Sequence, residues 1–225
     1  MESMKNLNQI EPYKLSEKYT IYKLKYNGIF SKEDFLKRVF QNKSLYAVEK
    51  TKRDNSLLIY IDCNEFQNLE NFVCDTISSY FNINTSYKAK SSWIYTQNQD
   101  FNMNWMHTHE YLHSSNNTNL KTEYTFVFYI QIPNDIKNGE GDIVFKTEDN
   151  ILHRFTPTEF DIFIFSGDLP HMAIPTQNSK TERIVYASNL SFDFTKKVNT
   201  KNNRIRFKNV IYKKLFGHNR DLGIK

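Results

Sequence analysis

The stretch LHRFTPTEFDIFIFSGDLPHMAI, residues 152–174, decides the fold class. It holds three short runs rich in Phe, Ile and Leu, at 152–155, 160–165 and 171–174, with polar turns that contain Pro or Gly between them. Runs of this length, bounded by turn residues, are typical of strands and too short for helices. The stretch therefore predicts three consecutive β-strands.

The same pattern extends outward on both sides of this stretch. Aromatic and β-branched runs recur between polar turns from about residue 88 to residue 195, and no helical spacing interrupts them. A succession of short strands without helices indicates a sandwich or a barrel. The expected strands are Ser91–Thr96, Asn104–His109, Tyr124–Ile132, Asp142–Lys146, Leu152–Phe155, Phe160–Phe165, His171–Ile174 and Ile184–Phe194.

The N-terminal part has a different pattern, in which helical spacing alternates with single short strands. Ser31 is a good N-cap for a predicted helix over 32–41, and a longer helix is predicted over 63–82. Short strands are predicted at Tyr19–Tyr26 and Leu57–Ile61, whereas the polar residues 1–18 are expected to be loosely ordered. The fold class is therefore α+β, with helices that buttress a C-terminal β-core.

Charge separates the end of the chain from the rest. The net charge is +5, but residues 196–225 alone carry +9, so the remaining residues sum to −4. We expect three regions: an N-terminal buttress (1–87), a β-core (88–195) and a basic tail (196–225). The tail could contact nucleic acid through phosphates, or it could be a solvated end or an edge strand shielded by charge.

Cysteine use and hydropathy bear on the compartment. Cys63 and Cys74 both fall in the predicted helix over 63–82, about 16 Å apart along its axis, which is too far for a disulfide. The absence of a disulfide framework favours a reducing compartment. The sequence begins without a signal-peptide pattern and holds no apolar run long enough to span a membrane. We therefore expect a cytoplasmic protein, in the host cytoplasm if it is viral, without membrane contact.

Three histidines form the candidate metal site. His107 and His109 are two residues apart in a predicted strand, so both imidazoles point to one face. His171 begins a later strand, which a rolled barrel can bring beside the first. Three nitrogens on one face leave open positions on an octahedral metal such as Fe(II). Ordinary surface or core histidines are the alternative, and His113, His153 and His218 are interpreted that way.

Arg183 opens the last predicted strand, twelve residues after His171. Its guanidinium is a fixed fork that binds a carboxylate through two hydrogen bonds. The functional hypothesis is that Arg183 binds an acidic small molecule near the metal. The structural alternative is a surface salt bridge with Glu182 or Asp161.

Residues 91–194 resemble the Fe(II)/2-oxoglutarate-dependent oxygenases found in phages and bacteria. The resemblance rests on motifs that occur in the same order with similar spacings. They are Trp93, Trp105-Met-His107-Thr-His109, Phe128-Tyr129-Ile-Gln-Ile-Pro133, Gly141-Asp-Ile-Val-Phe145, Phe160-Asp161-Ile-Phe-Ile-Phe165, Leu169-Pro-His171, and Glu182-Arg183 followed by Asn189. The resemblance implies a double-stranded β-helix of the jelly-roll or cupin-like kind for the core.

The family resemblance also implies roles for individual residues. His107, His109 and His171 would bind Fe(II), and Arg183 would pair with the distal carboxylate of the co-substrate 2-oxoglutarate. Asn189, Tyr95 and Tyr124 would contribute to the co-substrate pocket. The implied reaction is a dioxygenase reaction, in which O2 and 2-oxoglutarate serve to hydroxylate a substrate while 2-oxoglutarate is decarboxylated to succinate.

Two positions depart from the family pattern. Most oxygenases of this kind have Asp or Glu where this chain has His109, and Glu110 would reach the site only through a bulge. Tyr95 stands where the pattern has Asn. The metal site therefore contains either three histidines, or two of them with or without Glu110.

Two other functions stay open at this point. A cupin-type protein would use the three histidines without 2-oxoglutarate, and a metal-free barrel would serve as a binding or structural module. The substrate could be an amino acid or peptide, a nucleobase or a small metabolite, and the sequence makes no prediction of oligomeric state.

Overall fold

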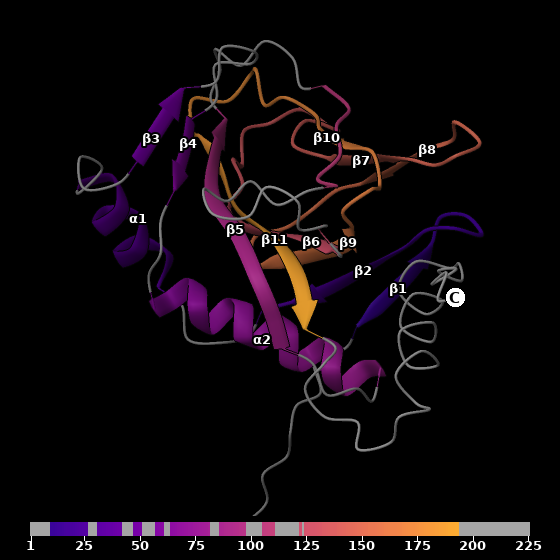
Figure 1. Cartoon of the computed structure of the whole chain (residues 1–225). Helices are drawn as coiled ribbons and strands as arrows, with labels where there is room; N and C mark the ends of the chain where they lie inside the picture. The colour runs from indigo at the N-terminus through magenta and orange to yellow at the C-terminus, as the bar shows by residue number, and fades with distance from the viewer. Residues whose placement is uncertain are drawn as a thin grey trace, which may run out of the picture.

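The computed structural model describes residues 10–26, 31–41, 47–50, 57–60, 64–81, 86–97, 105–110, 122 and 124–193. Within them, two helices and eleven strands follow one another (Figure 1). The elements are β1 (Glu11–Lys14), β2 (Thr20–Lys25), α1 (Lys32–Gln41), β3 (Ala47–Lys50), β4 (Leu57–Tyr60), α2 (Asn64–Phe81), β5 (Ser86–Gln97), β6 (Tyr124–Gln131), β7 (Ile143–Lys146), β8 (Leu152–Phe155), β9 (Asp161–Ser166), β10 (His171–Ala173) and β11 (Arg183–Asp193).

The strands form two sheets, and every strand pairing is antiparallel. The large sheet has the order β1-β2-β9-β6-β11-β5-β4-β3, and the small sheet has the order β10-β7-β8. From β5 onward the chain alternates between the two sheets, since β5, β6, β9 and β11 lie in the large one and β7, β8 and β10 in the small one. This alternation is the predicted sheet-rich, barrel-like arrangement.

The large sheet is buried on both faces because apolar residues occupy both sides of its central strands. In β6, Phe126 and Phe128 pack with the helices, whereas Val127 and Tyr129 pack with the small sheet. This division follows from the period of two along a strand. The continuous burial of β6 explains why its sequence is an unbroken apolar run rather than an alternating one.

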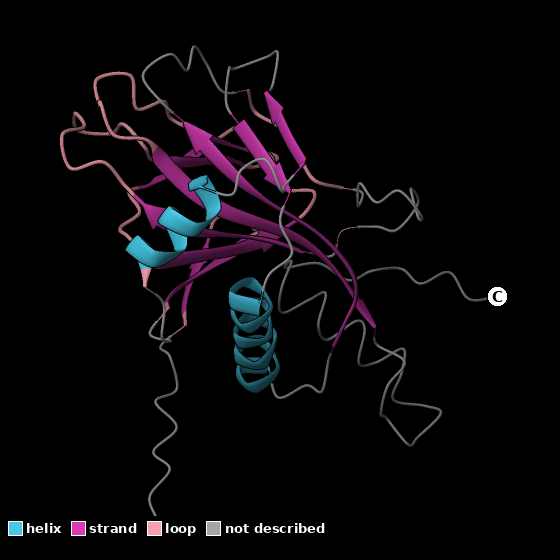
Figure 2. Cartoon of the chain, turned by 90° about the vertical axis from the view of Figure 1, so that its left-hand side faces the viewer, coloured by secondary structure: helices cyan, strands magenta, loops and turns pink. Residues whose placement is uncertain are grey.

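Helix α2 lies along one face of the large sheet (Figures 1 and 2). Its apolar face includes Phe66, whose ring stacks on Tyr186 of β11 at 3.7 Å between centroids. The buried carboxylate of Glu70 accepts hydrogen bonds from the hydroxyls of Tyr186 at 2.6 Å and Ser92 at 2.8 Å. These bonds join α2 to two neighbouring strands of the sheet and satisfy an otherwise costly buried charge.

The predicted elements agree closely with the observed ones. Ser31 caps α1 as expected, since its hydroxyl accepts a hydrogen bond from the backbone N–H of Asp34. The prediction was wrong for part of the N-terminus, because residues 11–14 form β1 by pairing with β2. Strand β3 was also missed. The predicted strand Asn104–His109 is in the described part only a single bridge, between His107 and His171.

Some predictions fall outside the described residues. The basic tail (196–225), Cys63, His113 and His218 are among them. Cys74 is a free, buried thiol. Among the helices that are described, none is long and apolar enough to cross a membrane.

Candidate metal centre

The segment 105–110 is held beside the small sheet by backbone hydrogen bonds. His107 and His171 exchange two N–H···O bonds of 3.0 Å each, so the later strand lies next to the first, as predicted. The backbone N–H of His109 donates to the carbonyl oxygen of Gly167 at 2.7 Å. Gly167 fits this approach because a Cβ there would lie 2.8 Å from the carbonyl oxygen of His109.

The side chains of His107, His109 and His171 converge. One ring nitrogen from each lies within 4.8 Å of the other two. The ring centroids are 4.5 Å apart for His107 and His171, 4.9 Å for His107 and His109, and 5.0 Å for His109 and His171. Two nitrogens bound to one ion at ~2.1 Å each are at most about 4.2 Å apart, so small side-chain rotations bring all three within bonding distance.

Backbone carbonyls fix the tautomer of two of these rings. The Nδ1 atom of His107 lies 2.8 Å from the carbonyl oxygen of Trp105, and that of His171 lies 2.9 Å from the carbonyl oxygen of Leu169. Because a carbonyl only accepts, Nδ1 carries the proton in both rings and Nε2 carries the lone pair. Metal-binding histidines are usually oriented in this way.

The surroundings of His171 keep it neutral. Its side chain is buried against the rings of Phe165 and Phe145. Burial, followed by the proximity of His107 and His109, lowers the pKa of His171 well below its usual value. A neutral imidazole is the form that binds a metal.

The described donor set contains nitrogen and no carboxylate. Glu110 is exposed, and it does not belong to the cluster formed by the three histidines. It is adjacent to His109 in the segment, where the period of two directs it to the other side. The sequence left open whether His109 or Glu110 completes the site. The structure brings His109, and not Glu110, to the other two histidines.

Arg183 begins β11 and is 2% exposed, although it carries a full charge. Its Nη1 donates to Oε1 of Gln97 at 2.8 Å, its guanidinium carbon lies 5.0 Å from the centroid of the Tyr129 ring, and its Nε has no hydrogen-bond partner. Among the described residues, no carboxylate lies within salt-bridge distance of it. The alternative ion pair with Asp161 is not formed, since Asp161 pairs with Lys23 and Lys25.

Asn189 and Tyr95 share the inner face of the large sheet with Arg183. Asn189 lies six residues after Arg183 in β11, and its Oδ1 accepts a hydrogen bond from Thr125 at 2.8 Å. Its Nδ2 is buried without a partner in the described part of the chain. Tyr95 packs at the edge of the inner apolar cluster, and its hydroxyl lies 3.5 Å from Nε2 of Gln97.

Tyr124 is the one predicted pocket residue that the structure does not bring to this face. It packs in the cluster between the sheet and the helices, with its hydroxyl 3.5 Å from Sγ of Cys74. The period of two separates it from Thr125, which faces inward. Tyr124 therefore lies in the apolar cluster with the helices, apart from the cluster that contains Tyr129.

Three buried polar residues near Arg183 were missed by sequence reasoning. They are Gln97, Tyr129 and Thr176; the hydroxyl of Thr176 has no partner among the described residues, whereas that of Tyr129 interacts with the Arg183 side chain. Burial is the largest influence on the pKa of Tyr129 and raises it. A polar residue in an apolar strand was the available signal, but only the strand register shows that these residues surround Arg183.

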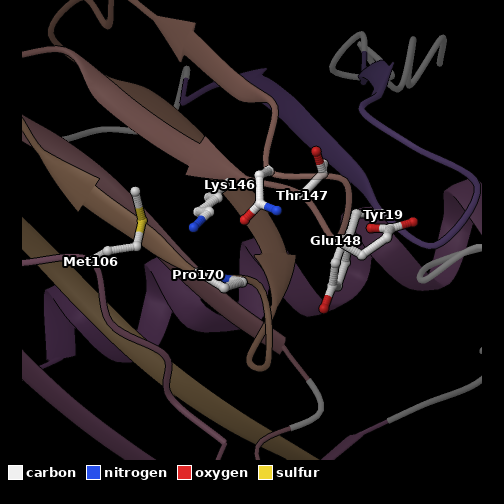
Figure 3. Close-up of a pocket in the computed structure, with 7 residues that line it drawn as sticks. Tyr19, Met106, Lys146, Thr147, Glu148 and Pro170 are labelled. Atoms are coloured by element: carbon white, nitrogen blue, oxygen red, sulfur yellow. The ribbon is translucent and has the colours of Figure 1, made fainter.

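A hollow of about 400 Å³ lies beside the segment that carries His107 (Figure 3). Its lining includes Met106 and Lys146, which precede His107 and follow Phe145 in the sequence. None of the three histidines is among its lining residues. Its other lining residues are Tyr19, Thr147, Glu148, Asn150 and Pro170.

No protein-family model and no curated protein matches the chain. Solved structures do match. The non-heme α-ketoglutarate-dependent carbocyclase SnoK from nogalamycin biosynthesis has a TM-score of 0.55 at 10% identity, over 76% of this chain and 79% of that one. A Trichoplax adhaerens prolyl hydroxylase, in complex with a peptide of hypoxia-inducible factor, has a TM-score of 0.53 at 13% identity, over 76% and 83%.

The viral collagen prolyl hydroxylase of Paramecium bursaria Chlorella virus-1, in its 2OG complex, has a TM-score of 0.51 at 14% identity, over 76% of this chain and 94% of that one. Two of the three are named as prolyl hydroxylases, and the third is named as an α-ketoglutarate-dependent carbocyclase. The chain thus shares its fold with 2-oxoglutarate/Fe(II) oxygenases.

Proposed function

We propose that this protein is an Fe(II)- and 2-oxoglutarate-dependent dioxygenase built on a double-stranded β-helix. The core would be residues 88–195, whose strands alternate between two antiparallel sheets. The single observation that carries the proposal is the combination of three convergent histidines with a buried arginine that has no described carboxylate partner.

The residues present fit a metal and an acidic co-substrate. His107, His109 and His171 would hold the metal, with two of the rings already oriented by backbone carbonyls. Imidazole is a suitable ligand for iron, and three ligands on one side leave positions free. Iron, when bound, supplies the activation of O2 that is coupled to the decarboxylation of 2-oxoglutarate.

Arg183 would orient the co-substrate. Its unpartnered Nε and its charge suit the distal carboxylate, and the buried hydroxyls of Tyr129 and Thr176 are available as hydrogen-bond donors. Phe145 and Phe165 exclude water from the side of His171. Low local polarity strengthens each of these charged contacts.

The proposal covers the metal and 2-oxoglutarate but does not name the substrate that is oxidised. The similar structures are named as prolyl hydroxylases or a carbocyclase, so one fold supports different substrates. The substrate that is oxidised therefore stays open among peptides, nucleobases and metabolites.

The cupin-type alternative uses the same three histidines but does not explain why Arg183 is buried near other polar side chains. A buried guanidinium with no described carboxylate partner is costly for the free protein, and an acidic ligand would offset that cost. The metal-free barrel gives no reason for three histidines to converge. These two observations favour the oxygenase.

The test is the conversion of 2-oxoglutarate by purified protein with Fe(II) and O2. We expect succinate and CO2 to form slowly even without the substrate, and to stop when a chelator removes the metal. Arg183→Ala should raise the concentration of 2-oxoglutarate required. Metal-bound protein that neither binds nor converts 2-oxoglutarate would support the cupin-type function instead.

A further inference from the structure

Gln97 stands directly opposite Arg183 in the pairing of β5 with β11. Directly opposed residues of an antiparallel pair have side chains on the same face. Gln97 is 0% exposed, and its Oε1 accepts a hydrogen bond from Nη1 of Arg183 at 2.8 Å. Gln97 therefore determines which N–H groups of the guanidinium remain for a ligand.

The chemistry fixes how the Gln97 amide is oriented. A guanidinium donates and never accepts, so the amide oxygen must face Arg183 and the amide nitrogen must point away. The nitrogen lies 3.5 Å from the hydroxyl of Tyr95, two residues earlier on the same face. The amide of Gln97 thus contacts Arg183 through its oxygen and Tyr95 through its nitrogen, and these contacts orient the guanidinium.

The Gln97 side chain is neutral, so it binds the guanidinium without cancelling its positive charge. A glutamate has nearly the same shape, and at this position it would neutralise Arg183 within the buried pair. The amide supplies one acceptor and leaves the positive charge uncompensated by the described residues. Nε of Arg183 also stays without a partner.

Gly141 lies beside the aliphatic part of the Arg183 side chain. A Cβ built on Gly141 would lie 3.9 Å from Cδ of Arg183 and 3.5 Å from Cγ2 of Thr176, so both side chains flank this glycine. Gly141 also has a φ of +77°, which side chains rarely tolerate. The buried hydroxyl of Thr176 has no partner in the described structure, and that of Tyr129 interacts with the Arg183 side chain, so hydroxyls of two residues lie near Arg183.

We propose that Gln97 is a positioning and specificity-determining residue: it fixes Arg183 by one neutral hydrogen bond and keeps its charge free for the distal carboxylate of the co-substrate. The inference rests on the proposed function. It predicts that the protein distinguishes a 2-oxo dicarboxylate from a 2-oxo monocarboxylate, and that residue 97 controls this distinction through Arg183.

The experiment compares two ligands by calorimetric titration of Mn(II)-loaded protein without O2. The first ligand is 2-oxoglutarate. The second is 2-oxopentanoate, which has the same carbon chain but a methyl group in place of the distal carboxylate. In Gln97→Glu, the new carboxylate occupies the guanidinium, so the affinity for 2-oxoglutarate should fall by about tenfold or more, whereas the affinity for 2-oxopentanoate stays the same.

Gln97→Asn is the matched neutral variant, and it keeps the test valid if Gln97→Glu does not fold. Its shorter amide cannot reach Nη1 but adds no charge. We expect the same selective loss for 2-oxoglutarate, smaller than in Gln97→Glu. The Mn(II) affinity of both variants should equal that of the unmodified protein, because residue 97 is not a metal ligand.

Each result has a distinct meaning. A selective loss for 2-oxoglutarate supports the role of Gln97. Equal affinity for 2-oxoglutarate in the variants and the unmodified protein overturns it, as does an equal loss for both ligands, which would indicate a merely structural role. If the unmodified protein binds Mn(II) but not 2-oxoglutarate, the proposed function itself fails, and the inference fails with it.

Discussion

Replacing Arg183 with methionine should leave the ligand-free fold nearly as stable as before but remove its stabilisation by 2-oxoglutarate. Methionine is an unbranched apolar side chain that replaces the aliphatic part of arginine and removes the charge. In the free protein the guanidinium is buried beside Gln97 and Tyr129 without a described counter-ion. Its contribution to the fold and its contribution to binding are therefore separable.

The expected stability follows from opposing contributions. Exchanging a buried ionic group for an apolar one of similar size is neutral to stabilising, by roughly 1–4 kcal/mol. The change also removes the cation–π contact with Tyr129, about 0.5–2 kcal/mol, and leaves Oε1 of Gln97 unsatisfied, about 1–3 kcal/mol. At the middle of these ranges the terms nearly cancel, about 2.5 against about 3.3 kcal/mol, so Tm should change by only a few degrees.

The ligand effect is larger and has a fixed sign. At 100 times its Kd, a ligand stabilises the folded state by about 2.7 kcal/mol. For a chain of this size, each kcal/mol corresponds to about 2–4 °C in Tm. Mn(II)-loaded protein with saturating 2-oxoglutarate should therefore melt roughly 5–10 °C higher than without it, and Arg183→Met should show almost none of this shift.

The assay is thermal unfolding followed by circular dichroism, with and without 2-oxoglutarate. Arg154→Met is the control, because Arg154 is a half-exposed arginine that pairs with Asp142. That variant should lose stability and keep the ligand shift. If Arg183→Met kept the full shift, the assignment of the carboxylate site to Arg183 would be wrong.

Three further predictions concern the fold and the state of the site. The pKa of His171 is lowered by burial and by its two histidine neighbours, so as the pH falls the unfolded chain is protonated at His171 before the folded one. Metal-free protein should therefore lose up to about 1.4 kcal/mol of stability per pH unit below about pH 6.5. Urea unfolding between pH 7.5 and 5 measures this loss, and the part due to His171 should be absent in His171→Asn. Glu70→Ala should destabilise by about 1–3 kcal/mol, because it removes the acceptor of the buried Tyr186 hydroxyl; an unchanged stability in urea unfolding would contradict the role given to this carboxylate. Gly139→Ala should destabilise by about 1–2 kcal/mol, since Gly139 has a φ of +88° and a Cβ would meet Arg154; an unchanged Tm would argue against that turn geometry.

Sequence predicted the β-core well because its strands are short aromatic and β-branched runs bounded by strong turn signals. The run Leu152–Phe155 was predicted with the observed bounds. The next strand begins at Asp161 rather than Phe160, because Phe160 adopts a φ of +69°. A left-handed aromatic residue carries no sequence signal, so this boundary could not be predicted.

Edge strands were harder to predict than central ones. The short β1 contains Pro12 and charged residues, which are depleted in strands, and it is stabilised by pairing with β2 rather than by its own propensity. Strand β3 is another four-residue edge of the large sheet. In both, tertiary contacts override the local preference.

The three histidines and Arg183 could be predicted because their spacing and residue types suggest their chemistry. Gln97 could not, since its importance depends on the register that places it opposite Arg183. The position of Tyr124 in the cluster with the helices could not be predicted either, because a strand buried on both faces does not reveal from its sequence which side is inward.

The most direct test of the central claim measures metal and 2-oxoglutarate binding in one sample. Metal-free protein is titrated anaerobically with Fe(II) and then with 2-oxoglutarate, beside His171→Asn. The account predicts one Fe(II) per chain, 2-oxoglutarate binding that requires the metal, and the loss of both in the variant. Stoichiometric 2-oxoglutarate binding without metal, or undiminished Fe(II) binding by His171→Asn, would contradict it.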